Sequence, residues 1–213
     1  MERWATFDCY GTLIDWNTGI GRELERLFGA DRVPELLHAY HELEPQLQRE
    51  DPSRSYRDVT TLALARLGAP AGETDALARS LPGWPPFPEV PAALDEARAR
   101  GWRLAVLSNS DRDLIDESLA CIGVPFDRSL VASEIDSYKP APAHWEEFFG
   151  RSGAKREAHV HVAASLFHDI APATGLGLRT VWINRLGEAA EPQPDVELRS
   201  LDGLADALDS LVP

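Results

Sequence analysis

Cysteine, positive charge and long apolar runs are all scarce in this chain of 213 residues. Its two cysteines, Cys9 and Cys121, lie far apart, so a cysteine-based metal motif is excluded and nothing indicates a disulfide framework. Lysine and arginine number 21 against 35 acidic residues, and the net charge of −14 makes nucleic acids and anionic membranes poor partners. No apolar stretch approaches the length that spans a bilayer.

Compartment and size follow from the same composition. Strand-forming residues begin by Trp4, which leaves no room for a secretion signal, and with reduced cysteines this predicts a cytoplasmic protein. The hydrophobic fraction of 44% is ample for a buried core, and the length suits one large domain or a domain with an insertion. A homodimer is compatible with this composition.

Strands and helices alternate over most of the chain. Short apolar runs predict strands at 3–8, 102–107, 128–133, 159–164 and 179–184. Apolar residues at helical spacing predict helices over 91–100, 111–121, 142–150, 169–176 and 201–211. Such alternation predicts a doubly wound α/β fold, in which a parallel sheet is covered by helices on both faces through right-handed crossovers.

A purely helical stretch interrupts this alternation after the first strand. Helical spacing of apolar residues covers 18–29, 34–49, 55–67 and 73–81, and a proline-rich segment at 82–88 ends the stretch. Pro45 is expected to kink the second helix or to begin a new one. We therefore predict an α-helical cap over 16–87, inserted into a core formed by 1–15 and 88–213.

Polar side chains recur where the predicted strands end. Asp8 closes the first strand and is followed by Gly11 and Thr12, in the place where α/β folds hold their ligands. Alone, this aspartate would read as an ordinary helix N-cap. Further strand-end or loop residues follow in order: Ser108 and Asn109, then Lys139, then Asp169.

This ordered series resembles the four motifs of the haloacid dehalogenase superfamily, and the resemblance runs from about Ala5 to about Arg185. It implies that Asp8 is a nucleophile and that Thr12 supports it. It also implies that Ser108, Asn109 and Lys139 hold a small anionic substrate. Asp169 is expected to position the hydrolytic water or to pair with Lys139.

Tyr10 and the fourth motif favour the 2-haloacid dehalogenase branch over the phosphatases. Phosphatases of the superfamily usually carry a second aspartate where Tyr10 stands, and a phenol is a poor general acid at neutral pH. Dehalogenases typically have an aromatic residue there, because a departing halide needs no proton. Ala163 and Ala164 replace the Gly-Asp pair of the phosphatases, so one magnesium ligand is missing and no metal is expected.

Three functions therefore stay open. The resemblance favours hydrolysis through an aspartyl ester, without a cofactor and of the 2-haloacid dehalogenase type. A magnesium-dependent small-molecule phosphatase is the first alternative, and a non-catalytic binding protein of the same fold is the second. The dehalogenase branch has a cap arginine that receives the halide, but none stands between Leu37 and Glu42, where His38, Tyr40 and His41 are the first candidates for substrate selection.

Overall fold

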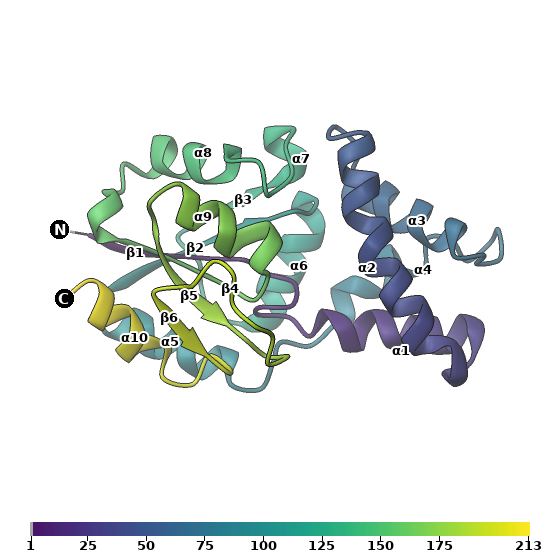
Figure 1. Cartoon of the computed structure of the whole chain (residues 1–213), viewed down its shortest axis with the longest axis horizontal. Helices are drawn as coiled ribbons and strands as arrows, with labels where there is room; N and C mark the ends of the chain where they lie inside the picture. Colours follow the sequence, from purple (N-terminus) through teal and green to yellow (C-terminus); the bar gives the residue numbers. More distant parts are fainter. Residues whose placement is uncertain (1) are drawn as a thin grey trace.

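Six parallel strands form a single sheet in the computed structural model, which describes residues 2–213 (Figure 1). The strands are β1 (Arg3–Phe7), β2 (Trp102–Ser108), β3 (Arg128–Val131), β4 (His159–Ala163), β5 (Arg179–Ile183) and β6 (Val196–Leu198). Their order is β3-β2-β1-β4-β5-β6. The predicted doubly wound α/β fold is confirmed, and β1 and β4 lie side by side at its centre.

Helices cover both faces of this sheet. One face is packed by α5 (Val90–Ala99), α6 (Arg112–Ile122) and α10 (Leu204–Leu211), and the other by α8 (Ala143–Ser152) and α9 (Ala171–Gly175). Alternate residues of a strand point to opposite faces. Accordingly, Phe7 belongs to the apolar cluster of the first face, and Trp4 packs with Trp145 and Phe148 on the second.

Four helices lie beside the sheet rather than on it, at the right of Figure 1. They are α1 (Trp16–Phe28), α2 (Val33–Glu50), α3 (Tyr56–Arg66) and α4 (Ala76–Ser80). Two connectors join them to the sheet and pair with one another. Asp15 N–H donates to the Pro85 carbonyl at 3.1 Å, and Phe87 N–H donates to the Leu13 carbonyl at 3.0 Å. The boundaries of a cap at residues 16–87 stay a prediction, with both connectors lying at its edges.

The remaining elements are short. They are α7 (Ala132–Ile135), the 3₁₀ turns η1 (Ala30–Arg32), η2 (Leu81–Gly83) and η3 (Arg156–Ala158), and the π-helical turn η4 (Leu166–Ile170). The helix expected over 169–176 is thus divided between η4 and α9. The sixth strand, β6, was not predicted, because its three residues are partly exposed and show no apolar run.

Pro45 does not begin a new helix, and that part of the expectation is wrong. Helix α2 runs unbroken from Val33 to Glu50 with Pro45 inside it. Proline removes a single helical hydrogen bond. Leu36, Tyr40 and Leu47 of the same helix are buried in the apolar cluster that also includes Phe7, and this packing holds the helix on both sides of the proline.

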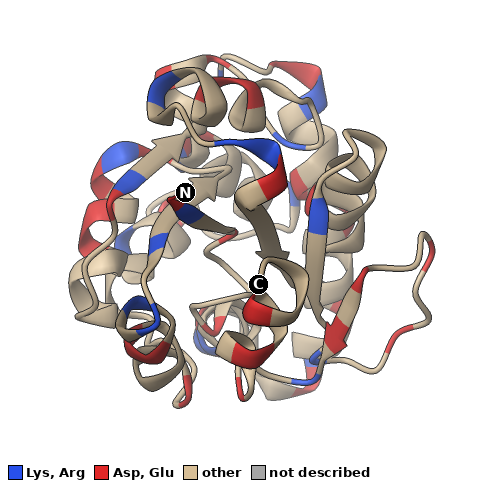
Figure 2. Cartoon of the chain, turned by 90° about the vertical axis from the view of Figure 1, so that its left-hand side faces the viewer, with Lys and Arg blue, Asp and Glu red and all other residues tan. Residues whose placement is uncertain are grey.

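The surface carries charges of both signs. Seen from the end opposite the four helices, acidic and basic residues alternate along the elements of the core (Figure 2). Arg100, for example, contacts Asp206 at 2.7 Å and Asp209 at 3.0 Å. Such exposed pairs contribute little stability individually. No helix within residues 2–213 is both long and apolar enough to cross a membrane.

Candidate active site

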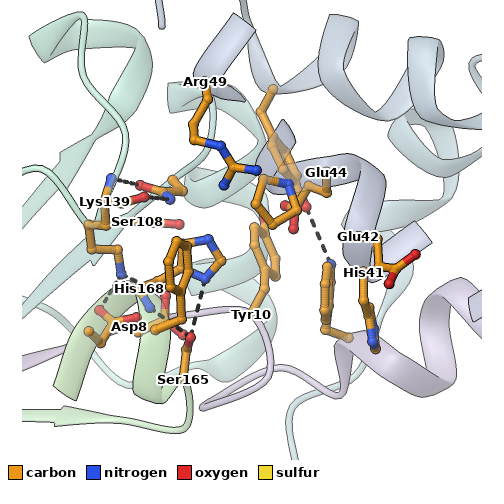
Figure 3. A pocket seen from close by; sticks show the side chains of 16 residues that line it. Asp8, Tyr10, His41, Glu42, Glu44, Arg49, Ser108, Lys139, Ser165 and His168 are labelled. Atoms are coloured by element: carbon orange, nitrogen blue, oxygen red, sulfur yellow. Dashed lines mark hydrogen bonds and ion pairs between the residues drawn. The ribbon is translucent and has the colours of Figure 1, made fainter. Parts of the chain in front are cut away.

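A cavity of about 600 Å³ lies between the ends of the central strands and helix α2 (Figure 3). All of the predicted site residues except Thr12 line it. The complete lining is Asp8, Tyr10, Trp16, His41, Glu42, Glu44, Pro45, Arg49, Tyr56, Ser108, Asn109, Lys139, Ser165, Phe167, His168 and Asp169. Ligands of open α/β sheets bind at this place in the fold.

Asp8 is held by a donor on each carboxylate oxygen. Thr12 Oγ1 donates to Oδ2 at 2.8 Å, and Lys139 Nζ donates to Oδ1 at 2.9 Å. Gly11 has φ of +89°, a conformation that glycine adopts without strain, and so the loop turns back sharply enough to bring Thr12 beside Asp8. Burial raises the pKa of the Asp8 carboxyl, against the opposing effect of Lys139. The Thr12 support implied by the motif is therefore seen as a direct contact.

Lys139 is buried at the centre of the site with every ammonium hydrogen in use. Its Nζ donates to Asp8 at 2.9 Å, to the Leu107 carbonyl at 2.8 Å and to Asp169 Oδ1 at 2.6 Å. Burial disfavours the charged amine, but the two carboxylates outweigh burial and raise the pKa of Lys139. An ammonium group has three donors, so none is left to bind a substrate directly.

Ser108 and Asn109 follow the end of β2 and both line the cavity. The Asn109 amide holds both backbone polar groups of Lys139, because Nδ2 donates to the Lys139 carbonyl at 2.9 Å and Oδ1 accepts from the Lys139 N–H at 2.6 Å. The buried His144 donates through Nε2 to the Ser108 carbonyl at 3.0 Å. Asn109 therefore fixes the loop that carries Lys139, while its second amide hydrogen and the Ser108 hydroxyl have no partner among residues 2–213.

Asp169 reaches the site from the π-helical turn η4. The turn starts at Ser165, whose Oγ accepts from the His168 N–H at 3.0 Å. Asp169 Oδ1 accepts from Lys139 at 2.6 Å, so the pairing named as one of its two expected roles is observed. Asp8 and Asp169 thus share one ammonium. No cluster of three or more metal-ligating side chains occurs within residues 2–213.

Tyr10 lines the cavity with its ring and turns its hydroxyl away. The hydroxyl donates to the Leu114 carbonyl at 3.3 Å and lies 3.0 Å from Ser118 Oγ, both on α6. The ring stacks on Tyr56 with centroids 6.2 Å apart. Burial raises the pKa of the Tyr10 phenol well above its ordinary value. Tyr10 therefore presents apolar surface to the cavity and has no proton in position for a leaving group.

The structure separates the three cap residues proposed for substrate selection. His38 does not face the cavity, because its side chain is 79% exposed and lies 3.7 Å from Glu42. Tyr40 is fully buried in the cap, with its ring against Trp16. His41 alone lines the cavity, where it stacks on Trp16 with centroids 5.0 Å apart. Helical spacing explains the outcome, since adjacent residues of a helix point in different directions.

Arg49 is a cavity residue that the sequence reasoning missed. In Figure 3 its guanidinium points from α2 toward the core residues, and no ion-pair or hydrogen-bond partner is seen among residues 2–213. It follows His41 and Pro45 at steps of four residues, a spacing that places all three on one helix face. The search for a cap arginine ended at Glu42, seven residues too early.

Glu44, Phe167 and His168 were also missed. Glu44 is buried on α2, accepts from Gln48 Nε2 at 3.2 Å, and burial raises its pKa to about 7. Phe167 is 52% exposed beside the cavity, and His168 Nε2 is buried without a partner among the described residues. No periodic signal marks Phe167 and His168, because they belong to a single π-helical turn.

Known proteins resemble this chain in both sequence and fold. A model of the haloacid dehalogenase-like hydrolases matches residues 3–177. An (S)-2-haloacid dehalogenase of Pseudomonas sp. (strain YL) is 31% identical over 96% of this chain and 93% of its own length. A crystallised L-2-haloacid dehalogenase superposes with a TM-score of 0.87 and 26% identity, covering 97% of this chain and 98% of its own.

One similar protein has a different activity in its name. The phosphoserine phosphatase of Thermus thermophilus is 32% identical over 59% of this chain and 51% of its own length. The similarity to the Pseudomonas dehalogenase thus extends over much more of both chains.

Replacing Lys139 by methionine is expected to destabilise the protein strongly. The change leaves Asp8 and Asp169 buried without their shared cation, so the free energy of unfolding at pH 7 should fall by about 3–5 kcal/mol. The folded-state pKa of Lys139 lies above its ordinary value of 10.5, so this difference should persist up to that pH and shrink only above it. Urea denaturation measures both effects.

The matched control is the other lysine of the chain, Lys155, which is exposed. Lys155→Met should change the free energy of unfolding by less than about 0.5 kcal/mol. A similarly small change in Lys139→Met would contradict the central position assigned to this ammonium.

Proposed function

The chain belongs to the haloacid dehalogenase-like hydrolases, and from that premise we propose that it hydrolyses 2-halo acids through an ester on Asp8. The observation on which this proposal depends is that two carboxylates, those of Asp8 and Asp169, accept hydrogen bonds from the same ammonium group of Lys139 in the cavity. One carboxylate, Asp8, is the nucleophile. The other, Asp169, accepts a proton from the water that hydrolyses the ester. The similar dehalogenases named above support this assignment.

In the first step an Asp8 oxygen attacks the carbon that bears the halogen. A carbon–oxygen bond forms, the carbon–halogen bond breaks, and the halide leaves with the bonding electron pair. No proton is transferred in this step. The site therefore needs no acid at Tyr10, whose hydroxyl points away from the cavity and contacts α6. Thr12 and Lys139 fix the two oxygens of Asp8 before the attack.

In the second step water opens the ester at the Asp8 side-chain carbonyl carbon. Asp169 takes a proton from the water as the new bond forms, and that proton passes to the departing hydroxyl of the product. The water's other proton is released to solvent, and Asp8 regains its charge. The net reaction converts a 2-halo acid and water into a 2-hydroxy acid, a halide ion and a proton.

Arg49 and Ser108 are the groups that we assign to the substrate carboxylate and the halide. Lys139 was expected to hold the carboxylate, but its three ammonium donors are all engaged within the protein. Asn109 uses one amide hydrogen on the Lys139 carbonyl and keeps the other for the substrate. Arg49 has no ion-pair partner among the described residues, so its guanidinium supplies the positive charge that an anion needs. It thereby takes the place of the cap arginine that the family resemblance implies.

Residues 16–87 act in this proposal as a cap that selects the substrate. Arg49, Glu44 and His41 all come from α2, whereas Asp8 and Lys139 come from the core. Closing such a cap would exclude bulk water during the lifetime of the ester. Core residues would then determine the chemistry, and cap residues would determine which acid enters.

A magnesium-dependent phosphatase is the second candidate, and the similar phosphoserine phosphatase is the observation in its favour. The residues present do not fit the ion. Magnesium prefers several convergent oxygen ligands, but here Asp8 and Asp169 flank an ammonium, and Ala164 offers no carboxylate. We therefore propose a reaction without a cofactor. A non-catalytic role is disfavoured by the close Asp8–Thr12 and Asp8–Lys139 contacts.

Asp8→Asn is expected to abolish chloride release from (S)-2-chloropropionate while the protein stays folded. The amide has nearly the volume of the carboxylate but lacks the charged oxygen that attacks carbon. Chloride release and circular dichroism, measured with and without EDTA, test the proposal. Wild-type activity in the variant would refute the covalent mechanism, and an activity that EDTA removes and magnesium restores would favour the phosphatase.

Arg49→Gln should raise the KM for (S)-2-chloropropionate by about tenfold to a hundredfold, since a charge-assisted hydrogen bond to the substrate is lost. Stability should change by less than about 0.5 kcal/mol, because Arg49 is exposed. Arg22→Gln, in an exposed residue of α1 outside the cavity, is the matched control and should leave KM unchanged. An unaltered KM in Arg49→Gln would remove Arg49 from the substrate site.

A further inference from the structure

A line of buried polar side chains leads from the sheet to Asp169. His159 and His161 lie on β4, Thr6 lies beside them on β1, and Thr6 and His161 are partners in the strand register. All three are fully buried on the face covered by α8, where the Trp145 ring meets His161 edge-on at 5.2 Å. Fully buried histidines in a sheet interior are uncommon, and neither step of the proposed reaction uses them.

The contacts along this line are short and continuous. His161 Nε2 lies 3.0 Å from Asp169 Oδ1, and His161 Nδ1 lies 2.8 Å from Thr6 Oγ1. The same hydroxyl oxygen lies 2.8 Å from His159 Nε2. The line therefore runs from His159 through Thr6 and His161 to Asp169, which itself contacts Lys139.

The direction of each hydrogen bond follows from the Asp169 end. An ionised carboxylate only accepts, so His161 Nε2 carries the hydrogen and donates it. Burial lowers the pKa of His161 to about 3, so the ring is neutral and Nδ1 is an acceptor. Thr6 Oγ1 must then donate to Nδ1, and its lone pairs accept from His159 Nε2. Both histidines are thus assigned the Nε2–H tautomer.

We propose that His161 is a positioning residue, which fixes the orientation of the Asp169 carboxylate for hydrolysis of the ester. Oδ1 of Asp169 receives two donors, Lys139 and His161, from different elements. Oδ2 is buried and accepts nothing from residues 2–213. The two donors prevent the carboxylate from rotating, and Oδ2 keeps its lone pairs for the water.

His161 has a task that Lys139 alone does not fulfil. Before the reaction, Lys139 is attracted by two negative charges, those of Asp8 and Asp169. Once Asp8 is an ester it is neutral, and the forces on the ammonium change between the two steps. The contact of His161 with Asp169 involves no group that changes charge in the first step. His161 therefore holds Asp169 in the same orientation before and after the ester forms.

The tautomer is tested on the wild-type protein without any substrate. Long-range proton–nitrogen NMR correlations of labelled histidine should show His161 neutral, with the hydrogen on Nε2, and should show the same form for His159. A hydrogen on Nδ1 of His161, or a charged ring at neutral pH, would overturn the proposal, because neither form is compatible with the deduced directions.

The positioning role, which rests on the proposed function, is tested with (S)-2-chloropropionate and three variants. His161→Leu removes the donor, whereas His161→Gln keeps an amide hydrogen near the position of Nε2. His161→Leu should slow ester hydrolysis about tenfold or more while the first turnover of chloride stays fast, giving a burst. His161→Gln should stay within about threefold of wild type.

His159→Leu is the matched control, because His159 shares the strand, the burial and the Thr6 contact of His161 but does not touch Asp169. It should lower stability like His161→Leu and yet show no burst. A burst in both leucine variants, or in neither while His161→Leu remains folded, would overturn the positioning role. If wild type released no chloride, the proposed function and the positioning role in ester hydrolysis would both fail, and the NMR result would decide only whether His161 donates to Asp169.

Discussion

The site depends on one buried ammonium placed between two carboxylates. Lys139 contacts Asp8 and Asp169 within 2.9 Å and is itself only 1% exposed. Without it, two like charges would face each other in a buried site with no cation between them. Its third donor goes to the Leu107 carbonyl at the end of β2 and ties the ion pairs to the sheet. The loop geometry around Asn109 and Thr12 serves to keep this arrangement in place.

Under the proposed function, that arrangement also divides the work between the core and residues 16–87. Because Lys139 is saturated, the positive charge that attracts an anion into a protein of net charge −14 has to come from elsewhere. In the proposed reaction Arg49, which lines the cavity from α2, provides it. A chemical step built on the rigid sheet is thereby combined with recognition built on a separate helical unit. Proteins that share the core chemistry could in this way differ in substrate by changes in one helix.

The sequence was most informative where a strand ends in a polar residue. Asp8 and Ser108 were recognised at strand ends, and parallel strands bring such ends to one edge of a sheet. Lys139 and Asp169, in a loop and in the turn η4, were recognised from their place in the same ordered series. Residues whose contribution depends on three-dimensional contacts were not recognised. The engaged donors of Lys139 and the contacts of Asn109 with the Lys139 backbone are visible only in the three-dimensional structure, and His161 looked like an ordinary strand residue. The disruption of helix α2 by Pro45 was overestimated, because helix propensity does not include the packing of the helix against its neighbours.

The covalent role of Asp8 is the central claim, and oxygen labelling tests it most directly. With enzyme in excess over (S)-2-chloropropionate in H₂¹⁸O, a single turnover should give 2-hydroxypropionate whose new hydroxyl oxygen is unlabelled, because that oxygen comes from Asp8. Mass spectrometry of the peptide that contains Asp8 should then show the ¹⁸O in its carboxylate. Labelled product in the first turnover, with an unlabelled Asp8 peptide, would mean that water attacks the substrate directly and would contradict the account.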